Sequence, residues 1–191
     1  MLYMIARGLL RVYFSLFRGW VINGIENVPA KGSLIVVANH SSYWDPPIVG
    51  SVLPRRVYFM AKEELFRYPL FGNLLSLLGA FPVKRGAPDR TAIRRALTIL
   101  QDGLVLGMFP EGTRSKSGKL GEAQPGVALL ALKSGSPILP IGISGAHDRS
   151  KLVIKIGEPF LLSVDSRQKE SLRIAGKEIM QRIDNLLIKG N

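Results

Sequence analysis

The sequence predicts one α/β domain, in which helices flank a mostly parallel (mixed) sheet. Short uncharged runs that are typical of buried strands, such as residues 33–38, alternate with amphipathic helical segments. This alternation is typical of parallel sheets covered by helices. The length of 191 residues suits a single domain, and no internal repeat, linker or low-complexity tract divides the sequence.

Residues 1–18 are expected to form an N-terminal amphipathic helix. Its apolar side chains recur at helical spacing and form one stripe, at Leu2, Ile5, Leu9, Val12 and Leu16, which Phe14 and Phe17 extend. The helix either packs on the core or lies in a membrane interface, where its arginines would meet anionic lipid. Its uncharged runs reach only six residues, which is too short for a membrane span.

The next elements lead to the first polar cluster. Residues 19–29 predict a short strand and a turn before the strand at 33–38. A helix is expected directly after His40, with Ser41 or Ser42 as its N-cap, ending near Val52. A strand at 56–61, an apolar helical segment restarted at Pro69 and a brief strand at 81–85 follow.

The second half continues the alternation. An amphipathic helix capped by Asp89 and closed by Gly103 precedes a strand at 104–109. A polar, glycine-rich stretch at 115–126 predicts a surface loop or a flap over a site. The remaining predicted elements are a helix at 126–134, strands at 137–143 and 151–157, and an amphipathic helix at 167–188.

The composition restricts the partners and the chemistry. A formal net charge of +12 favours anionic partners, such as anionic lipid, phosphorylated substrates, an acidic carrier protein or nucleic acid. Nucleic acid is not expected, because no recognisable binding motif or exposed basic helix is present. The absence of cysteine excludes disulfides and cysteine nucleophiles, and with two histidines no metal site is expected.

His40 and Asp45 form the first candidate for catalysis. His40 follows the predicted strand at 33–38, at the strand end where α/β proteins assemble their sites. The Asp45 carboxylate, about one helical turn on, could accept the Nδ1–H of His40 and leave Nε2 as a base. Alternatively, His40 bonds a backbone carbonyl and Asp45 caps the helix.

The stretch FPEGTRS, residues 109–115, brings a second polar group to the same edge of the sheet. Gly112 permits a tight turn with exposed amides, and the planar guanidinium of Arg114 suits a phosphate. Glu111 could accept hydrogen bonds from substrate hydroxyls or hold the arginine. The alternative is a surface turn with an ordinary ion pair.

A third group surrounds the apolar segment between two predicted strands. Lys62 and Arg85 each follow a strand, so both could converge on an anion. The segment between them is more apolar than one packing face needs. It therefore forms either a buried helix pair or a surface that contacts a membrane or an acyl chain.

Four ordered blocks resemble the glycerolipid acyltransferase family, most closely its 1-acyl-glycerol-3-phosphate O-acyltransferases. The blocks are NHSSYWD (39–45), KEELFRYPLFGNLLSLLGAFPVKR (62–85), FPEGTRS (109–115) and PILPIGI (137–143). The resemblance implies that His40 is the general base, oriented by Asp45. It also implies an acceptor site formed by Lys62, Arg85, Glu111, Gly112, Thr113 and Arg114, with Pro140 near the pocket, and residues 19–191 as the acyltransferase domain.

The implied reaction transfers an acyl chain from acyl-CoA or acyl carrier protein to lysophosphatidic acid (1-acyl-glycerol-3-phosphate). The product is phosphatidic acid, an intermediate of phospholipid biosynthesis, and no cofactor is expected. The amides of the helix start after His40 are the candidate donors to the oxyanion. We expect a peripheral or monotopic protein on the cytoplasmic face of the cell membrane.

Three alternatives remain open. The acceptor could be glycerol-3-phosphate or another lysolipid, which acceptor assays would separate. The chain could be a non-catalytic basic membrane-binding module, which would be indifferent to loss of the His40 imidazole. A hydrolase that uses His40 with water is the third, but the apolar segment and the cations suit lipid acyl transfer better.

Overall fold

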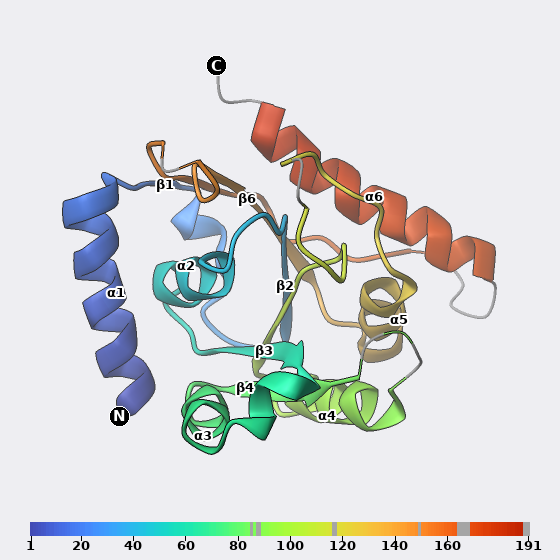
Figure 1. Ribbon diagram of the computed structural model, residues 1–191. Coiled ribbons are helices and arrows are strands. Elements are labelled where there is room, and N and C mark those ends of the chain that lie inside the picture. Colours follow the sequence, from blue (N-terminus) through green and yellow to red (C-terminus); the bar gives the residue numbers. More distant parts are fainter. Residues whose placement is uncertain (85, 87–88, 116–117, 149, 164–168, 189–191) are drawn as a thin grey trace.

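The computed structural model describes residues 1–84, 86, 89–115, 118–148, 150–163 and 169–188. A seven-stranded sheet with the order β1-β7-β6-β2-β5-β3-β4 runs through it (Figure 1). Strands β2 to β6 are parallel to one another, and β7 lies antiparallel to β6 and parallel to β1. The predicted single α/β domain with a mostly parallel sheet is confirmed.

The elements alternate along the chain as the sequence predicts. The strands are β1 (Val21–Asn23), β2 (Leu34–Ala38), β3 (Val57–Lys62), β4 (Ala80–Val83), β5 (Val105–Met108), β6 (Ile138–Ser144) and β7 (Val153–Ile156). The α-helices are α1 (Leu2–Arg18), α2 (Asp45–Val52), α3 (Pro69–Leu77), α4 (Arg90–Gln101), α5 (Pro125–Ser134) and α6 (Lys169–Ile188). Two short 3-10 helices are η1 (Ile25–Asn27) and η2 (Glu63–Arg67). The predicted start of the last helix at residue 167 lies outside the described residues.

Strand β2 lies at the centre of the sheet, with α1 and α2 over one face and α4, α5 and α6 over the other (Figure 1). All five of its residues are buried, because both faces carry a helical layer. One core cluster joins Phe14 of α1 and Ile48 of α2 to the sheet, and the other joins Ile99 of α4 and Ile179 of α6. The residues that directly follow β2, Asn39 and His40, are therefore attached to a rigidly held strand end.

The helix predicted directly after His40 begins later, at Asp45, and its N-cap is Trp44 rather than Ser41 or Ser42. Residues 41–44 form a turn, because the Asp45 carboxylate accepts the amides of Ser41 and Ser42. Two prolines follow Asp45 in the first helical turn, where a missing backbone N–H costs nothing. The prediction of a helix was right, and its start was wrong by about one turn.

Helix α1 docks on α2 while its apolar stripe faces outward. Phe14 is fully buried, and the Tyr3 hydroxyl donates to the Gly50 carbonyl and accepts from the Val57 amide, both at 3.1 Å. The exposed side chains are Leu2, Met4, Ile5, Leu9, Val12, Tyr13, Leu16 and Phe17. The helix therefore packs on the core, as one alternative predicted, but of the predicted stripe only Phe14 takes part in this packing. Among the described residues, no helix combines the length and apolar character needed to cross a bilayer.

The three arginines of α1 point to the protein rather than away from it. Arg7 and Arg11 donate to the Ser51 carbonyl, Arg11 also to that of Val52, at the end of α2. Cations suit this position, because the last carbonyls of a helix are unpaired and carry partial negative charge. Arg18 donates to the Gly145 carbonyl at 2.6 Å. These three side chains therefore bind carbonyls of the protein, and their contact with lipid stays a prediction.

Helix α3 and the preceding η2 also present apolar side chains to the outside. These are Leu65, Tyr68, Leu70, Phe71, Leu74 and Leu77. The alternative of a buried helix pair is therefore wrong. Arg56 lies over the rings of Tyr3 and Tyr58 and donates to the Leu77 carbonyl at 2.7 Å, so it connects α3 to the start of α1. In Figure 1 the N-terminal end of α1 lies at the same side of the molecule as α3.

Candidate active site

The candidate site lies at the carboxyl edge of the central strands. His40 follows β2, and Glu111 follows β5, its direct parallel neighbour in the sheet. The register pairs Val37 with Met108, so β2 and β5 end side by side at the same edge of the sheet. The prediction that residues 109–115 meet His40 at this edge is therefore confirmed.

The contact predicted between His40 and Asp45 is present. Asp45 Oδ2 lies 2.8 Å from His40 Nδ1, and it also accepts the amides of Ser41 and Ser42, each at 2.7 Å. The Asp45 side chain is fully buried, and only 11% of the His40 side chain is exposed. Three donors on one oxygen hold the carboxylate, and therefore the imidazole, in one orientation.

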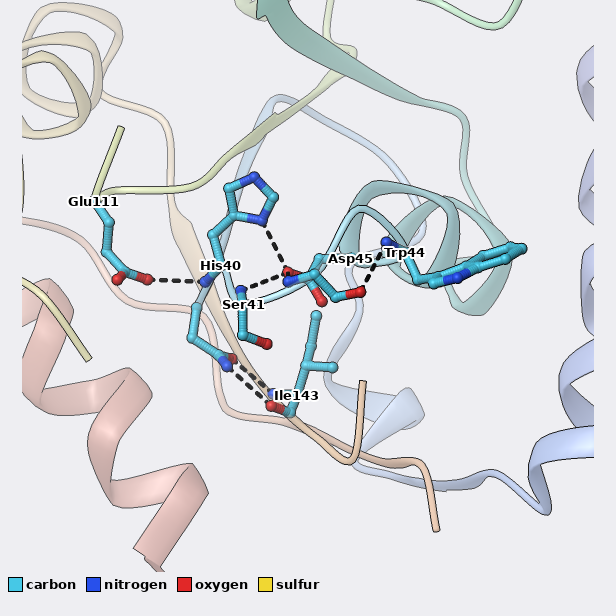
Figure 2. A network of polar contacts seen from close by, with 8 residues as sticks. His40, Ser41, Trp44, Asp45, Glu111 and Ile143 are labelled. Atoms are coloured by element: carbon cyan, nitrogen blue, oxygen red, sulfur yellow. Dashed lines mark hydrogen bonds and ion pairs between the residues drawn. The ribbon is translucent and has the colours of Figure 1, made fainter. Parts of the chain in front are cut away.

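The direction of this hydrogen bond determines what the imidazole can do. A carboxylate only accepts, so Nδ1 carries the proton and Nε2 keeps its lone pair. Figure 2 shows the second ring nitrogen of His40 pointing away from Asp45. The pair is arranged as a base and its orienting partner, with Nε2 available to a substrate hydroxyl.

The plane of the imidazole is fixed by an aromatic residue that sequence reasoning did not identify. The Phe109 ring stacks on His40 at 4.2 Å between centroids and 21°, and Phe59 of β3 stacks behind it at 6.0 Å. Phe109 is the first residue of the FPEGTRS stretch. Its position directly after a buried strand was the available signal.

Glu111 has a different task from the one predicted. Its side chain is buried, Oε1 accepts the backbone N–H of His40 at 2.8 Å, and Oε2 accepts that of Gly121 at 3.1 Å. Both oxygens therefore bind backbone amides, and within the described chain Glu111 makes no ion pair with Arg114. Glu111 therefore joins the loop after β2, through the His40 amide shown in Figure 2, to the loop after β5 and to Gly121.

The remaining residues of the FPEGTRS stretch form a turn close to His40. Gly112 adopts a positive φ of 69°, and its amide donates to the Phe109 carbonyl at 3.0 Å. Thr113 is exposed. The guanidinium of Arg114 lies over the ring of Tyr43, with Cζ 3.4 Å from its centroid.

Lys62, the described cation of the third group, lies further away along the sheet. Lys62 ends β3, and its ammonium, 49% exposed, pairs with Glu64 at 3.1 Å. β5 separates β3 from β2, so Lys62 shares the edge with His40 without a contact between them. Arg85 lies outside the described residues.

Asn39, the residue before His40, was also missed by the sequence interpretation. Its buried side-chain amide accepts the Ile143 N–H through Oδ1 at 2.8 Å and donates to the Ile143 carbonyl through Nδ2 at 2.9 Å. These two bonds imitate a ladder pair and hold the end of β2 to β6 (Figure 2). A polar residue at the end of a buried strand was the signal.

The backbone amides that follow His40 are not free. Ser41 and Ser42 donate to Asp45, so these amides cannot also bind a developing oxyanion. The prediction that the helix start supplies the oxyanion donors is therefore wrong for Ser41 and Ser42.

Two hollows adjoin the site. A cavity of about 10 Å³ touches His40, Ser41 and Glu111 and has room for about one water. A groove of about 1260 Å³ between residues 118–125 and α6 shares Gly118 to Leu120 and Leu187 with that cavity. In the described part of the chain, no group of three or more histidine or acidic side chains could hold a metal ion.

A comparison with protein families identifies the chain. The acyltransferase family model matches residues 20–144, a stretch that contains the whole of the site. The chain belongs to the acyltransferase family. The predicted resemblance is confirmed.

Related sequences match this acyltransferase over nearly its full length. It is 30% identical over 194 residues to the 1-acyl-sn-glycerol-3-phosphate acyltransferase of Bacillus subtilis, covering 97% of this chain and 96% of the relative. It is 29% identical to that of Streptococcus pneumoniae, covering 91% and 74% of the two chains. The crystal structure of the 1-acyl-sn-glycerophosphate (LPA) acyltransferase PlsC from Thermotoga maritima superposes with a TM-score of 0.77 at 28% identity, covering 99% of this acyltransferase and 81% of PlsC.

Proposed function

We propose that this acyltransferase transfers an acyl chain from a thioester, acyl-CoA or acyl carrier protein, to the sn-2 hydroxyl of 1-acyl-glycerol-3-phosphate. The product is phosphatidic acid. The observation that carries the proposal is the buried His40–Asp45 pair, 2.8 Å apart, with Nε2 directed away from the carboxylate (Figure 2). Relatives of matching length are named for this reaction.

The geometry supports a direct transfer without a covalent enzyme intermediate. Nε2 of His40 accepts the proton of the acceptor hydroxyl as its oxygen attacks the thioester carbonyl carbon. The new C–O bond forms, the C–S bond breaks, and the imidazolium returns the proton to the leaving thiolate. Asp45 stabilises the imidazolium through Nδ1–H, and the stacked Phe109 keeps the ring from rotating.

The acceptor phosphate is proposed to bind at Arg114. Its guanidinium follows the turn at Gly112, which the Ser115 amide ties to the His40 carbonyl at 2.8 Å. An arginine held close to the base can bind the phosphate and orient the hydroxyl at the same time. Lys62, at the same edge, adds a positive charge that attracts anions, and Arg85 is proposed as a further helper.

We also propose that the protein binds the membrane peripherally from the cytoplasmic side, through residues 1–18 and α3. The support is the exposed apolar stripe of α1, with Leu9 67% and Leu16 72% exposed, and the exposed side of α3. Because Arg7 and Arg11 cap α2 and Arg18 binds the Gly145 carbonyl, attraction to an anionic leaflet would come mainly from the net charge of +12.

The acceptor is tested by supplying purified protein with acyl-CoA or acyl carrier protein thioester and one acceptor at a time. Lysophosphatidic acid, glycerol-3-phosphate and a lysolipid with another headgroup are compared at equal concentration. The proposal predicts that lysophosphatidic acid gives the highest kcat/KM. Preferred acylation of glycerol-3-phosphate would replace the proposed reaction by transfer to sn-1.

A further inference from the structure

An exposed aromatic residue beside the site has no part in the mechanism above. Tyr43 lies in the turn between β2 and α2, and 77% of it is exposed. Its neighbour Trp44 turns toward α1, where its ring lies 5.6 Å from that of Tyr13 and 5.8 Å from that of Phe14. Tyr43 instead lies under the guanidinium of Arg114, 3.4 Å from Cζ.

The two loops that carry this pair are fixed to each other. The Ser115 amide donates to the His40 carbonyl, and the Glu111 carboxylate accepts the His40 amide, both at 2.8 Å. Tyr43 is three residues after His40, and Arg114 lies between Glu111 and Ser115. The stack therefore forms between two short segments whose ends are already held.

Stacking leaves the hydrogen-bonding capacity of Arg114 intact. The aromatic ring covers one face of the guanidinium, whereas all five N–H donors lie in the plane of the group and point from its edge. Among the described residues, no carboxylate forms an ion pair with these donors, and the nearby Glu111 binds only backbone amides. A phosphate accepts in that plane, so it can bind Arg114 without displacing Tyr43.

We propose that Tyr43 is a positioning residue for the acceptor phosphate. It holds Arg114 in the orientation in which the guanidinium edge meets the phosphate, and so reduces the freedom that this long side chain loses on binding. This inference rests on the proposed function and names a determinant of that same acceptor site. The exposure of Tyr43 argues against a role in the core, because it buries little apolar surface.

The test compares Tyr43→Leu and Tyr43→Phe, alone and combined with Arg114→Gln, in acyl transfer to lysophosphatidic acid. Tyr43→Leu should raise KM for lysophosphatidic acid about two- to fivefold with little change in kcat, because exposed cation–π contacts have this strength. Tyr43→Phe keeps the aromatic face and should stay near wild type. In the Arg114→Gln background, Tyr43→Leu should have no further effect.

Thermal unfolding of each variant separates positioning from folding, and Tyr43→Leu should unfold at the wild-type temperature. An unchanged KM in Tyr43→Leu would overturn the inference while leaving the proposed function in place. An equal KM increase in both Arg114 backgrounds would overturn it as well, because Tyr43 would then act independently of the arginine. If wild type does not acylate lysophosphatidic acid at all, the proposed function fails first, and this inference with it.

Discussion

Replacing Asp45 with asparagine tests the orienting contact directly. Oδ2 accepts three donors, whereas Oδ1 is buried and has no partner among the described residues. Asparagine can keep its oxygen at the Oδ2 position, which places its NH₂ group where Oδ1 lies and leaves two buried donors without acceptors. The imidazolium also loses the negative charge that stabilises it. A hydrogen bond to a charged group contributes about 1.5–3 kcal/mol, so kcat should fall about 10- to 160-fold.

The assay is acyl transfer to lysophosphatidic acid at saturating acceptor, with the free energy of unfolding measured for each variant. A cycle with His40→Ala supplies the control, since Asp45 is argued to act only through the imidazole. In the His40→Ala background, Asp45→Asn should change the residual rate by less than about twofold. The reasoning would be refuted if Asp45→Asn kept the wild-type kcat. It would also be refuted if Asp45→Asn lowered kcat as much in the His40→Ala background as in wild type.

Three further predictions concern docking, capping and membrane binding. Tyr3→Phe should lower the free energy of unfolding by about 1–3 kcal/mol, because the Val57 N–H loses its acceptor. Burial raises the pKa of Tyr3, so this difference should be present below pH of about 10 and shrink as the pH rises further, which urea unfolding at several pH values will show. Asp89→Ala should cost about 1 kcal/mol through loss of the N-cap of α4. The hydrogen bond from the Lys84 amide, followed by those from Ala92 and Thr91, lowers the pKa of Asp89, so the wild-type advantage should be lost as the pH falls below about 4. Leu16→Asp should reduce flotation with anionic phospholipid vesicles, while Ser15→Asp, which places the same charge at a neighbouring exposed position of the helix, should reduce it much less. Equal flotation of the two variants would contradict membrane binding through the stripe.

The contact between His40 and Asp45 could be predicted because it is local. A histidine at the end of a buried strand and a carboxylate five residues on can meet whether the segment between them is helix or turn. The form of that segment could not be predicted, because Ser capping and Asp45 capping compete for the same amides. Two prolines after Asp45 decide the competition by favouring a helix that starts there.

The task of Glu111 was beyond the sequence for a different reason. Its partners, the amides of His40 and Gly121, lie 71 and 10 residues away along the chain, and only the folded arrangement of the loops brings both amides to the Glu111 carboxylate. Apolar periodicity has a similar limit in α1, where it identified the stripe but not the medium it faces. Tyr3 and the arginines, which dock the helix together with Phe14, lie outside the predicted stripe.

The most direct test of the central claim is the rate of phosphatidic acid formation by purified wild type and His40→Ala. Both proteins receive lysophosphatidic acid with acyl-CoA and, separately, with an acyl carrier protein thioester. The account predicts that wild type forms phosphatidic acid and that His40→Ala loses at least about a hundredfold in kcat while it unfolds at the same temperature. Equal rates from the two proteins would contradict the role of His40 as the base.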